Sequence, residues 1–456
     1  MTDPYLPSEA TILEAPTAFK ERLKHLGPSL ILSAAIVGSG ELIATTALGA
    51  KAGFTLFWII FIGCLIKVAV QLEFGKHTIL TGETAMQAFN QLPGPKFGKA
   101  NWSVWGIFIM MLLKLFQLGG IVGGVAIILQ MVLPVFPVSF YAIFAALITS
   151  ALVFRGYYRM IEKLAIYMIF AFTVFTLTSL YSVSFTEYAF TFGDVLSGMS
   201  FSLPKEMVLL AIGAFGITGV GGDEIIQYNY WCLEKGYAAY VGPKPTEQSG
   251  QNYKNEWAVR AKGWIKVMHL DASIALVIYT VVTAAFYLLG ASILHRQGIV
   301  PEGFTLIEHL SKIYTLSLGA WAKYVFLAGA FVVLYSTLFA ACASWTRQYS
   351  DIFGQLGWID FFDFNQRKKS IAILAWAMPL IWAILFIFIN LPVLMVISGG
   401  IIGSFILILV VVATINFRYV RQPAEFRPSK LYDLILLLSI VSIFSIAVYG
   451  LVQFIF

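Results

Sequence analysis

A carboxylate stands in the middle of a long apolar run near the N-terminus. Glu41 follows Gly38, Ser39 and Gly40 in the stretch AAIVGSGELIATTALG. Because glycine costs about 1 kcal/mol of helix propensity relative to alanine, a helix unwinds easily at this point. An ionisable group at bilayer depth costs on the order of 2.5 kcal/mol or more and usually faces a cavity in which it acts. We therefore expect Glu41 to be a cation ligand, a proton carrier or both, rather than an acid that is paired with a buried lysine for packing alone.

A second apolar run has the same character at 216–227, where the sequence is GITGVGGDEIIQ. Thr218 and Gly221 are small residues at which backbone groups would be exposed, and the acids Asp223 and Glu224 follow them. Carboxylate oxygens are hard ligands, which suit Mg²⁺, Ca²⁺ or Mn²⁺ better than soft metals. The alternative is a seam of small residues for helix packing that ends in an interfacial pair of acids.

The backbone at these two stretches is compatible with two kinds of ligand. Carbonyl groups freed from a helix bind cations, whereas N–H groups at the start of a half-helix bind anions. For a metal cation, the expected side-chain ligands are Glu41 and Asp223. For an organic carboxylate, the backbone of Gly38–Gly40 would hold the ligand.

Other polar residues in apolar runs are candidates for coupling or gating: Lys114, Glu224, Gln227, His269 and Asp271. Lys114 lies near the middle of its run and is the expected ion-pair partner of Glu41. His269 and Asp271 open another run, where they could form a proton relay or cap the helix at the membrane interface. Lysines inside such runs are more typical of snorkelling or ion-paired residues than of substrate ligands, and this applies to Lys67, Lys114 and Lys323.

The composition places these residues in a membrane. Apolar residues make up 59% of the 456 residues and charged residues 12%, whereas soluble domains contain about 25% charged residues. The three cysteines show no CxxC spacing and the five histidines no HExxH motif, so neither a disulfide framework nor a zinc site is indicated. We also find no Ser/His/Asp set or phosphate loop that would favour a membrane-embedded enzyme, and we expect no cofactor and no nucleic-acid partner.

Apolar runs of about 20 residues can span a bilayer, and the chain has eleven: 28–50, 54–74, 104–133, 138–154, 164–182, 207–231, 267–289, 322–342, 371–389, 392–415 and 432–454. Most of the 30 Lys and Arg residues fall in the N-terminal segment and the even-numbered loops. The positive-inside rule then predicts a cytoplasmic N-terminus and an external C-terminus, in a plasma or inner membrane. The loop at 289–318 could carry a short external helix, and Trp257–Lys266 could lie along the interface or be a simple linker.

The two interrupted stretches fall in the first and sixth runs. Five spans per repeat give two repeats of opposite orientation, an arrangement in which the first helix of each repeat is broken at the midplane. We therefore expect an all-α membrane protein with these segments: a cytoplasmic segment (1–27), two five-helix repeats (28–190 and 191–417), and a loop with an eleventh helix (418–456).

The first two runs resemble those of the Nramp divalent-metal transporters. The similarity is carried by GSGELIATTALGAKAGFTLF at 38–57 and by VAVQLEFGKHTILTGE, which includes a Gln-Leu pair followed by Gly and then Thr-Gly. The span count, the orientation and the interrupted helices also agree with this family. The resemblance implies a leucine-transporter-type fold and proton-linked uptake of Mn²⁺ or Fe²⁺.

The family's ligand motifs are altered in this chain. The family carries Asp-Pro-Gly-Asn in the first break; here Gly38 stands for the ligand Asp, Ser39 for Pro, and Glu41 for the ligand Asn. In the sixth span the family has Met-Pro-His, and a gap-free placement puts Gly221–Asp223 there. The soft Met ligand is therefore missing, and Glu41 supplies a hard ligand in exchange.

Together these features favour a secondary-active transporter of a hard divalent cation of the Mg²⁺ or Mn²⁺ class, with protons as a candidate coupling ion. The alternative is the same fold carrying an organic carboxylate or amino acid, because Gly-Ser-Gly in the first span also resembles the amino-acid/polyamine/organocation transporters. A channel is a third reading, which currents far above transporter turnover would indicate.

Overall fold

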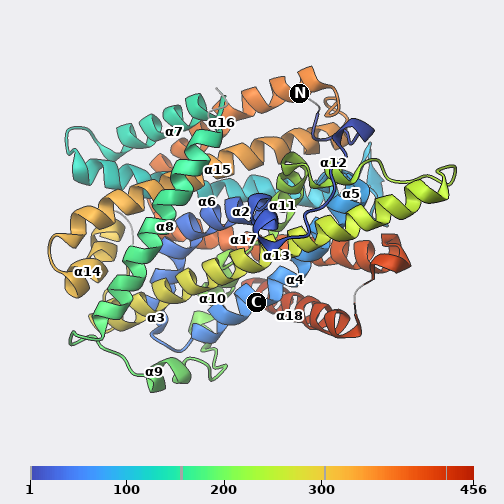
Figure 1. The fold of residues 1–456 in the computed structure, drawn as a ribbon. Coiled ribbons are helices and arrows are strands. Elements are labelled where there is room, and N and C mark those ends of the chain that lie inside the picture. The colour runs from blue at the N-terminus through green and yellow to red at the C-terminus, as the bar shows by residue number, and fades with distance from the viewer. Residues whose placement is uncertain (1–2, 155–157, 302–304, 428, 456) are drawn as a thin grey trace.

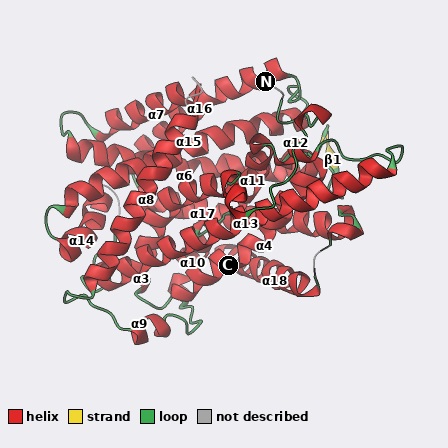
Figure 2. Cartoon of the chain, in the orientation of Figure 1, coloured by secondary structure: helices red, strands yellow, loops and turns green. Residues whose placement is uncertain are grey.

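The computed structural model describes the backbone of residues 3–154, 158–301, 305–427 and 429–455. Within these ranges, the side chains described exclude those at 34, 38–41, 158–162, 164–165, 169, 306 and 450–455. The described chain is a bundle of long, roughly aligned helices, with one small antiparallel hairpin of β1 (Lys96–Phe97) and β2 (Ala100–Asn101) (Figures 1 and 2).

The elements of the first half are η1 (Glu9–Thr11), α1 (Phe19–Lys24), α2 (Pro28–Ile36), η2 (Val37–Thr45), α3 (Thr46–Ala52), α4 (Phe57–Thr81), α5 (Ala85–Asn90), α6 (Trp102–Val132), α7 (Val138–Phe154), α8 (Tyr158–Val183) and α9 (Phe192–Ser197). Those of the second half are η3 (Lys205–Met207), α10 (Val208–Ile217), α11 (Gly222–Lys235), α12 (Tyr237–Val241), α13 (Gln251–Leu289), η4 (Gly290–Leu294), α14 (Leu306–Leu318), α15 (Ala322–Leu356), α16 (Phe364–Ile389), α17 (Pro392–Ile415), η6 (Asn416–Arg421), η7 (Ala424–Phe426) and α18 (Lys430–Ile455).

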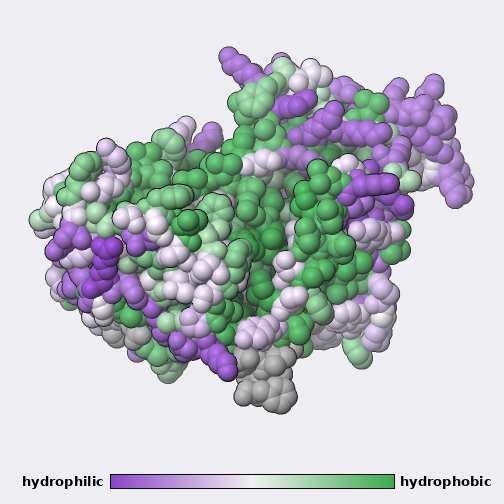
Figure 3. Space-filling view, turned by 90° about the horizontal axis from the view of Figure 1, so that it is seen from below, coloured by the Kyte–Doolittle hydropathy of each residue, from purple (hydrophilic) through white to green (hydrophobic). Residues whose placement is uncertain are grey.

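Each of the eleven predicted spans has a helical counterpart. Among the described residues, nine helical stretches are long and apolar enough to cross a membrane. The predicted first span is the helical run α2–η2–α3, and the predicted fourth is α7, with 17 residues. Figure 3 shows a broad apolar face across the middle of the bundle, with hydrophilic residues gathered toward its two ends. This distribution is the one that a bilayer requires.

Corresponding helices of the two expected repeats pack against each other. The second span, α4, lies against the seventh, α13; the third, α6, against the eighth, α15; and the fourth, α7, against the ninth, α16. The last helix, α18, packs on α4 and α17 at the outside of this arrangement. The helices therefore form two matched sets, and α18 is an additional helix outside them.

The first and sixth spans both depart from regular α-helical winding, but in different ways. The sixth is broken outright, because α10 ends at Ile217 and α11 begins at Gly222 with a non-helical segment between them. The first stays helical and changes its winding, since the nine residues of η2 form a π-helix between α2 and α3. π-Helical turns inside α-helices are rare and are frequent at functional sites.

The predicted extramembrane segments are more helical than expected. Residues Trp257–Lys266 belong to α13, which begins at Gln251 and extends well beyond the bundle (Figure 1). The reading as a simple linker is therefore wrong, and the interfacial position stays a prediction. Trp264 is buried there and its Nε1 donates to Leu13 O at 2.9 Å. The helix expected in the loop at 289–318 is α14.

The N-terminal segment, residues 3–25, covers one end of the bundle, which we call the N-segment end. Thr11 Oγ1 donates to Ala239 O at 2.9 Å, and Leu13 N donates to Tyr240 O at 3.0 Å. Tyr5 is buried, and its hydroxyl donates to Glu234 Oε1 at 2.8 Å. The segment is thus fixed onto α11, α12 and the start of α13.

Candidate functional site

The break in the sixth span is built into its sequence. Gly219 has φ +63°, a conformation that L side chains rarely adopt. A Cβ at Gly219 would also lie 3.1 Å from Cys64 Cα and 3.2 Å from the ring of Tyr279. The glycine therefore lets the chain turn and lets α4 approach the turn closely. The break that the sequence predicts around Thr218 and Gly221 is present.

A buried ion pair lies directly after this break. Asp223, in the first turn of α11, accepts from Lys114 Nζ of α6, and the two side chains are 3% and 2% exposed. Gln227 Nε2, one turn further along α11, lies 3.4 Å from the other oxygen of Asp223. Gln227 Oε1 in turn accepts from Ser344 Oγ of α15 at 2.9 Å. The polar chain Lys114–Asp223–Gln227–Ser344 therefore links three helices across the interior of the bundle.

A small cavity of about 20 Å³ lies beside this chain, between α2, α6, α11 and α15. A cavity of that size can hold about one water molecule. Its polar lining includes Gln117, Asp223, Glu224, Gln227 and Thr337. Gln117 Oε1 and Glu224 Oε2 are buried and have no hydrogen-bond partner among the described residues.

Buried oxygens without partners are rare in folded proteins. Together with the Asp223 carboxylate, Gln117 Oε1 and Glu224 Oε2 give the cavity a set of hard oxygen acceptors. Such a set suits a small cation or an ordered water. We call the cavity and these three residues the central site.

A second lysine contacts the other half of the broken span. Lys67 of α4 is fully buried, and its Nζ donates to Phe215 O at 2.6 Å and to Thr218 O. These carbonyl groups belong to the end of α10, where the last backbone bond runs from Thr218 N to Ala214 O at 2.8 Å. Thr218 Oγ1 donates a hydrogen bond to Ala214 O, which holds the Thr218 side chain against the end of α10.

The structure places the predicted residues unevenly. Asp223, Glu224, Gln227 and Lys114 come together, and the described partner of Lys114 is Asp223. The side chains of Gly38, Ser39, Gly40 and Glu41 lie outside the described residues, which leaves the expected pairing of Lys114 with Glu41 a prediction. Within the described residues, no group of three or more His, Cys, Asp or Glu side chains could hold a metal ion.

Asp271 is a helix cap and lies away from the central site. Its two oxygens accept from Gly27 N at 2.8 Å and from Ser29 N at 2.7 Å, at the start of α2. A carboxylate at a helix N-terminus satisfies free N–H groups and stabilises the helix dipole. Of the two roles considered for Asp271, this geometry fits the cap. His269 does not line the central site.

Sequence reasoning missed the contributions of Gln117, Thr337 and Ser344. Each is a polar residue in an apolar span, and this was the available signal. Thr337 Oγ1 donates to Ala35 O at 2.9 Å, so it joins α15 to the last turns of α2. A cavity-lining residue and a residue that only bonds its own backbone look alike in sequence, which is why these three were not singled out.

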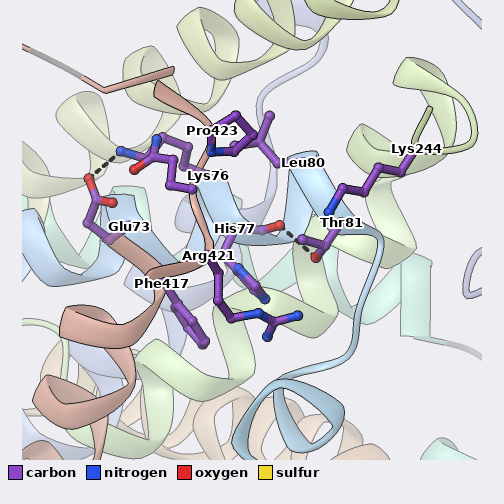
Figure 4. Close-up of a pocket in the computed structure, with 10 residues that line it drawn as sticks. Glu73, Lys76, His77, Leu80, Thr81, Lys244, Phe417, Arg421 and Pro423 are labelled. Atoms are coloured by element: carbon purple, nitrogen blue, oxygen red, sulfur yellow. Dashed lines mark hydrogen bonds and ion pairs between the residues drawn. The ribbon is translucent and has the colours of Figure 1, made fainter. Parts of the chain in front are cut away.

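A second polar cavity lies at the end of α4, with a volume also near 20 Å³ (Figure 4). Lys76 Nζ is 2.5 Å from Glu73 Oε1, and the ring of His77 stacks on that of Phe417 at 3.9 Å. Arg421 lies beside His77 in Figure 4.

Arg421 and His77 both bind Glu83, just beyond α4. Arg421 Nη2 donates to both carboxylate oxygens of Glu83 at 2.7 and 2.8 Å, and His77 Nε2 is 3.1 Å from Oε2. Burial raises the pKa of Glu83, but the hydrogen bonds and charges of His77 and Arg421 outweigh it and lower the pKa to about 2. Glu83 therefore joins His77 of α4 to Arg421 of η6, and the cluster acts as a clamp between these two elements.

Known proteins resemble this chain in sequence. The family model described as "Natural resistance-associated macrophage protein-like" matches residues 29–453. An uncharacterised protein of Pasteurella multocida, PM0681, is 24% identical over 75% of this chain and 73% of its own length. The divalent metal cation transporter MntH of Caldanaerobacter subterraneus subsp. tengcongensis is 22% identical over 67% of this chain and 66% of its own.

Solved structures share the fold. A manganese transporter of Eremococcus coleocola superposes with a TM-score of 0.59 at 15% identity, covering 98% of this chain and 99% of that one. The nucleobase-cation-symport-1 family transporter Mhp1 superposes with a TM-score of 0.57 at 16% identity, covering 96% and 92%. The expected leucine-transporter-type fold, with two inverted five-helix repeats and one extra helix, is thereby confirmed.

Proposed function

The chain belongs to the Nramp family of membrane transporters, and from this premise we propose that it moves a divalent metal cation across the membrane by secondary-active transport. The observation that carries the proposal is the central site, where the carboxylates of Asp223 and Glu224 and the amide oxygen of Gln117 meet at the broken sixth span. Transporters of this fold bind their substrates at such breaks. The name of the relative MntH, a divalent metal cation transporter, points the same way.

The donor set favours a hard ion of the Mg²⁺ or Mn²⁺ class. All the acceptors that line the central site are oxygens, and its described part contains no thiolate, thioether or imidazole ligand. Carboxylate and amide oxygens select such ions over soft metals. Glu41 and Asp223 remain the proposed metal ligands from the two interrupted helices, with Thr218, Gly221 and the backbone of Gly38–Gly40 around them.

Metal binding would require Lys114 to release Asp223. In the structure the ammonium group of Lys114 neutralises this carboxylate. When Lys114 turns away, Asp223 and Glu224 would share the incoming ion. Protons are the proposed coupling ions, since an acid at the membrane midplane can carry one, with Glu41 and Glu224 as the candidate carriers.

We further propose that the N-segment end faces the cytoplasm and that the protein resides in a plasma or inner membrane. The excess of Lys and Arg in the N-terminal segment and the even-numbered loops supports this orientation. The boundaries expected from the sequence, 28–190 and 191–417, remain the proposed limits of the two repeats.

Uptake into proteoliposomes tests the proposal. Wild type, Glu224→Gln and Glu41→Gln are reconstituted, and uptake of Mn²⁺ and Mg²⁺ is followed with an internal indicator dye. We expect both variants to lose at least about 90% of uptake, because each replaces a charged oxygen ligand by a weaker neutral one. Glu187→Gln, an exposed acid outside the helices, is the matched control and keeps full uptake. Wild-type rates in both Gln variants would remove these acids from the mechanism.

The same fold carrying an organic carboxylate is the second candidate, and the two buried lysines favour it. Lys67 and Lys114 both place ammonium groups at the break, and the N–H groups that begin α11 point to the same region. A thermal-shift screen separates the two candidates, because a bound substrate raises the melting temperature. Stabilisation by MnCl₂ or MgCl₂ supports the metal, and stabilisation by amino acids or small carboxylates at constant ionic strength supports the alternative.

A further inference from the structure

Lys67 is the one fully buried lysine of α4, and neither the proposed substrate site nor the family motif gives it a role. Its ammonium group lies at the C-terminal end of the half-helix α10 and bonds two backbone carbonyl groups, those of Phe215 and Thr218. Its Nζ also sits 4.8 Å from the centre of the Phe215 ring. Every one of these contacts is one that a cation makes.

The end of α10 attracts positive charge for a general reason. The last four carbonyl groups of a helix have no partners within it, and the helix dipole places about half a negative charge there. In transporters with broken helices, such half-helix ends and unwound carbonyl groups coordinate Na⁺ or H⁺. In this chain the ammonium group of Lys67, a residue of the second span, occupies the position that a free cation would take.

The surrounding residues are shaped to admit that side chain. A Cβ at Gly63, one turn before Lys67, would lie 3.3 Å from the Phe215 ring, so α4 and α10 are in close contact at this level. The turn at Gly219 approaches Cys64 equally closely. The ammonium group is thus held between α4 and the end of α10 where the two helices are in close contact.

We propose that Lys67 is a built-in monovalent cation: its ammonium group occupies the carbonyl site at the end of α10 and holds the break open without a bound ion. The proposal deepens the proposed transport function by assigning this half of the break to a fixed charge and leaving Asp223 and Glu224 to the substrate. Lys67 is accordingly a positioning residue. Removing it while leaving its space empty should create a site for a small free cation.

The test compares two neutral replacements in the purified full-length protein. Lys67→Ala leaves the carbonyl groups with an empty space, whereas Lys67→Met fills the same space with an uncharged chain. Melting temperatures are measured in choline, sodium, potassium and methylammonium chloride at constant ionic strength, without divalent ions. Lys51→Ala, an exposed lysine at the end of α3, is the control for loss of one positive charge.

We expect wild type and Lys51→Ala to melt at the same temperature in all four salts. Both Lys67 variants should melt lower in choline. Sodium or methylammonium should then raise the melting temperature of Lys67→Ala by on the order of 2 °C or more, with saturation, and should leave Lys67→Met unchanged. A purely structural lysine would not give this difference between the two variants.

Three results would overturn the proposal: a wild-type melting temperature that rises with sodium, equal salt responses of Lys67→Ala and Lys67→Met, or Lys67→Ala as stable as wild type in choline. If Lys67→Ala cannot be recovered in choline, it is prepared in methylammonium chloride. Aggregation when the amine is removed supports the proposal, and failure to recover the protein in any of the salts counts against it. No arm uses a divalent ion, so the outcome is independent of whether metal uptake is observed.

Discussion

At the scale of single residues, the charge balance of the central site depends on Lys114. Its ammonium group is the partner of Asp223, both side chains are almost fully buried, and Gln227 Nε2 also contacts the carboxylate. An ion pair in the interior contributes little net stability, but removing one partner leaves a buried charge without compensation. The pair is therefore best examined through its single and double replacements.

We predict that Lys114→Met destabilises the protein by roughly 3–5 kcal/mol, because the Asp223 carboxylate loses its counter-charge in the interior. The double variant Lys114→Met/Asp223→Asn should recover most of this loss, since neither charge is then present. Thermal unfolding in detergent without divalent ions measures both. A double variant no more stable than Lys114→Met would show that the two residues act independently.

Glu83 gives a prediction for the dependence of stability on pH. The hydrogen bonds and charges of His77 and Arg421 prevail over burial and lower its pKa from 4.5 to about 2. A carboxyl group whose pKa is depressed in the folded state stabilises that state above its unfolded pKa, and this contribution disappears as the pH falls through the folded pKa. The stabilisation by Glu83 should therefore be complete above about pH 5 and decline between pH 4.5 and 2.

The measurement is the difference in melting temperature between wild type and Glu83→Gln from pH 7 down to pH 3. We expect a constant difference above pH 5 and a smaller one at pH 3. Glu187→Gln, whose side chain is exposed, should match wild type throughout. A difference that grows on acidification would contradict the assignment of the clamp to an ionised Glu83.

Some of the site was predictable at this scale and some was not. Asp223, Glu224 and Lys114 stand out in sequence because a charged residue in an apolar run is costly and needs a reason. Their pairing was not predictable, since several acids compete for one lysine and only the position of Lys114 beside the first turn of α11 decides between them. For Asp271, a helix cap and a proton relay require the same residue type. The structure favours the cap, because the carboxylate accepts hydrogen bonds from two N–H groups at the start of another helix, α2.

At the scale of elements, the break in the sixth span separates this structure from a simple helical bundle. The left-handed backbone of Gly219 and its close approach to Cys64 leave no space for a side chain. Both halves of the span are otherwise normal helices, so a change at Gly219 acts on their relative placement. The geometry of the central site follows from that placement.

We predict that Gly219→Ala lowers both stability and metal uptake. The positive φ costs about 1–2 kcal/mol for an L residue, and the clash with α4 adds to it. Gly250→Ala is the matched control, because Gly250 has φ −61° and no atom within 4 Å of its Cβ position. Melting temperature and proteoliposome uptake are measured for both variants, and equal effects of the two substitutions would refute the role given to Gly219.

The elements themselves were largely predictable from hydropathy, because a membrane-spanning helix must be apolar over its full length. The predicted limits of α7, 138–154, and of α17, 392–415, coincide with the observed ones. The extension of α13 back to Gln251 was not predictable, since its first turns bond the preceding loop, where Tyr253 Oη donates to Pro243 O, and its later turns contact the N-terminal segment. The π-helix η2 was not predictable either. Its glycines indicate a low preference for the α-helix but do not distinguish a π-helix from a break.

At the scale of the whole molecule, the bundle has one end covered by the N-terminal segment and an opposite end at which α3 stops (Figure 1). The fold establishes that these ends differ, and the distribution of Lys and Arg predicts which of them faces the cytoplasm. Two exposed residues report on the two ends, Asn252 at the start of α13 and Lys51 at the end of α3. The three native cysteines, Cys64, Cys232 and Cys342, are buried and give little background labelling.

We predict that a membrane-impermeant maleimide added to intact cells labels Lys51→Cys and not Asn252→Cys, and that Asn252→Cys is labelled only after the membrane is permeabilised. The reason is that the N-segment end carries most of the positive charge, which resists translocation. Wild type, with its buried cysteines, is the control for background. Labelling of Asn252→Cys in intact cells, with protection of Lys51→Cys, would reverse the orientation. The end of the bundle at which α3 stops would then face the cytoplasm.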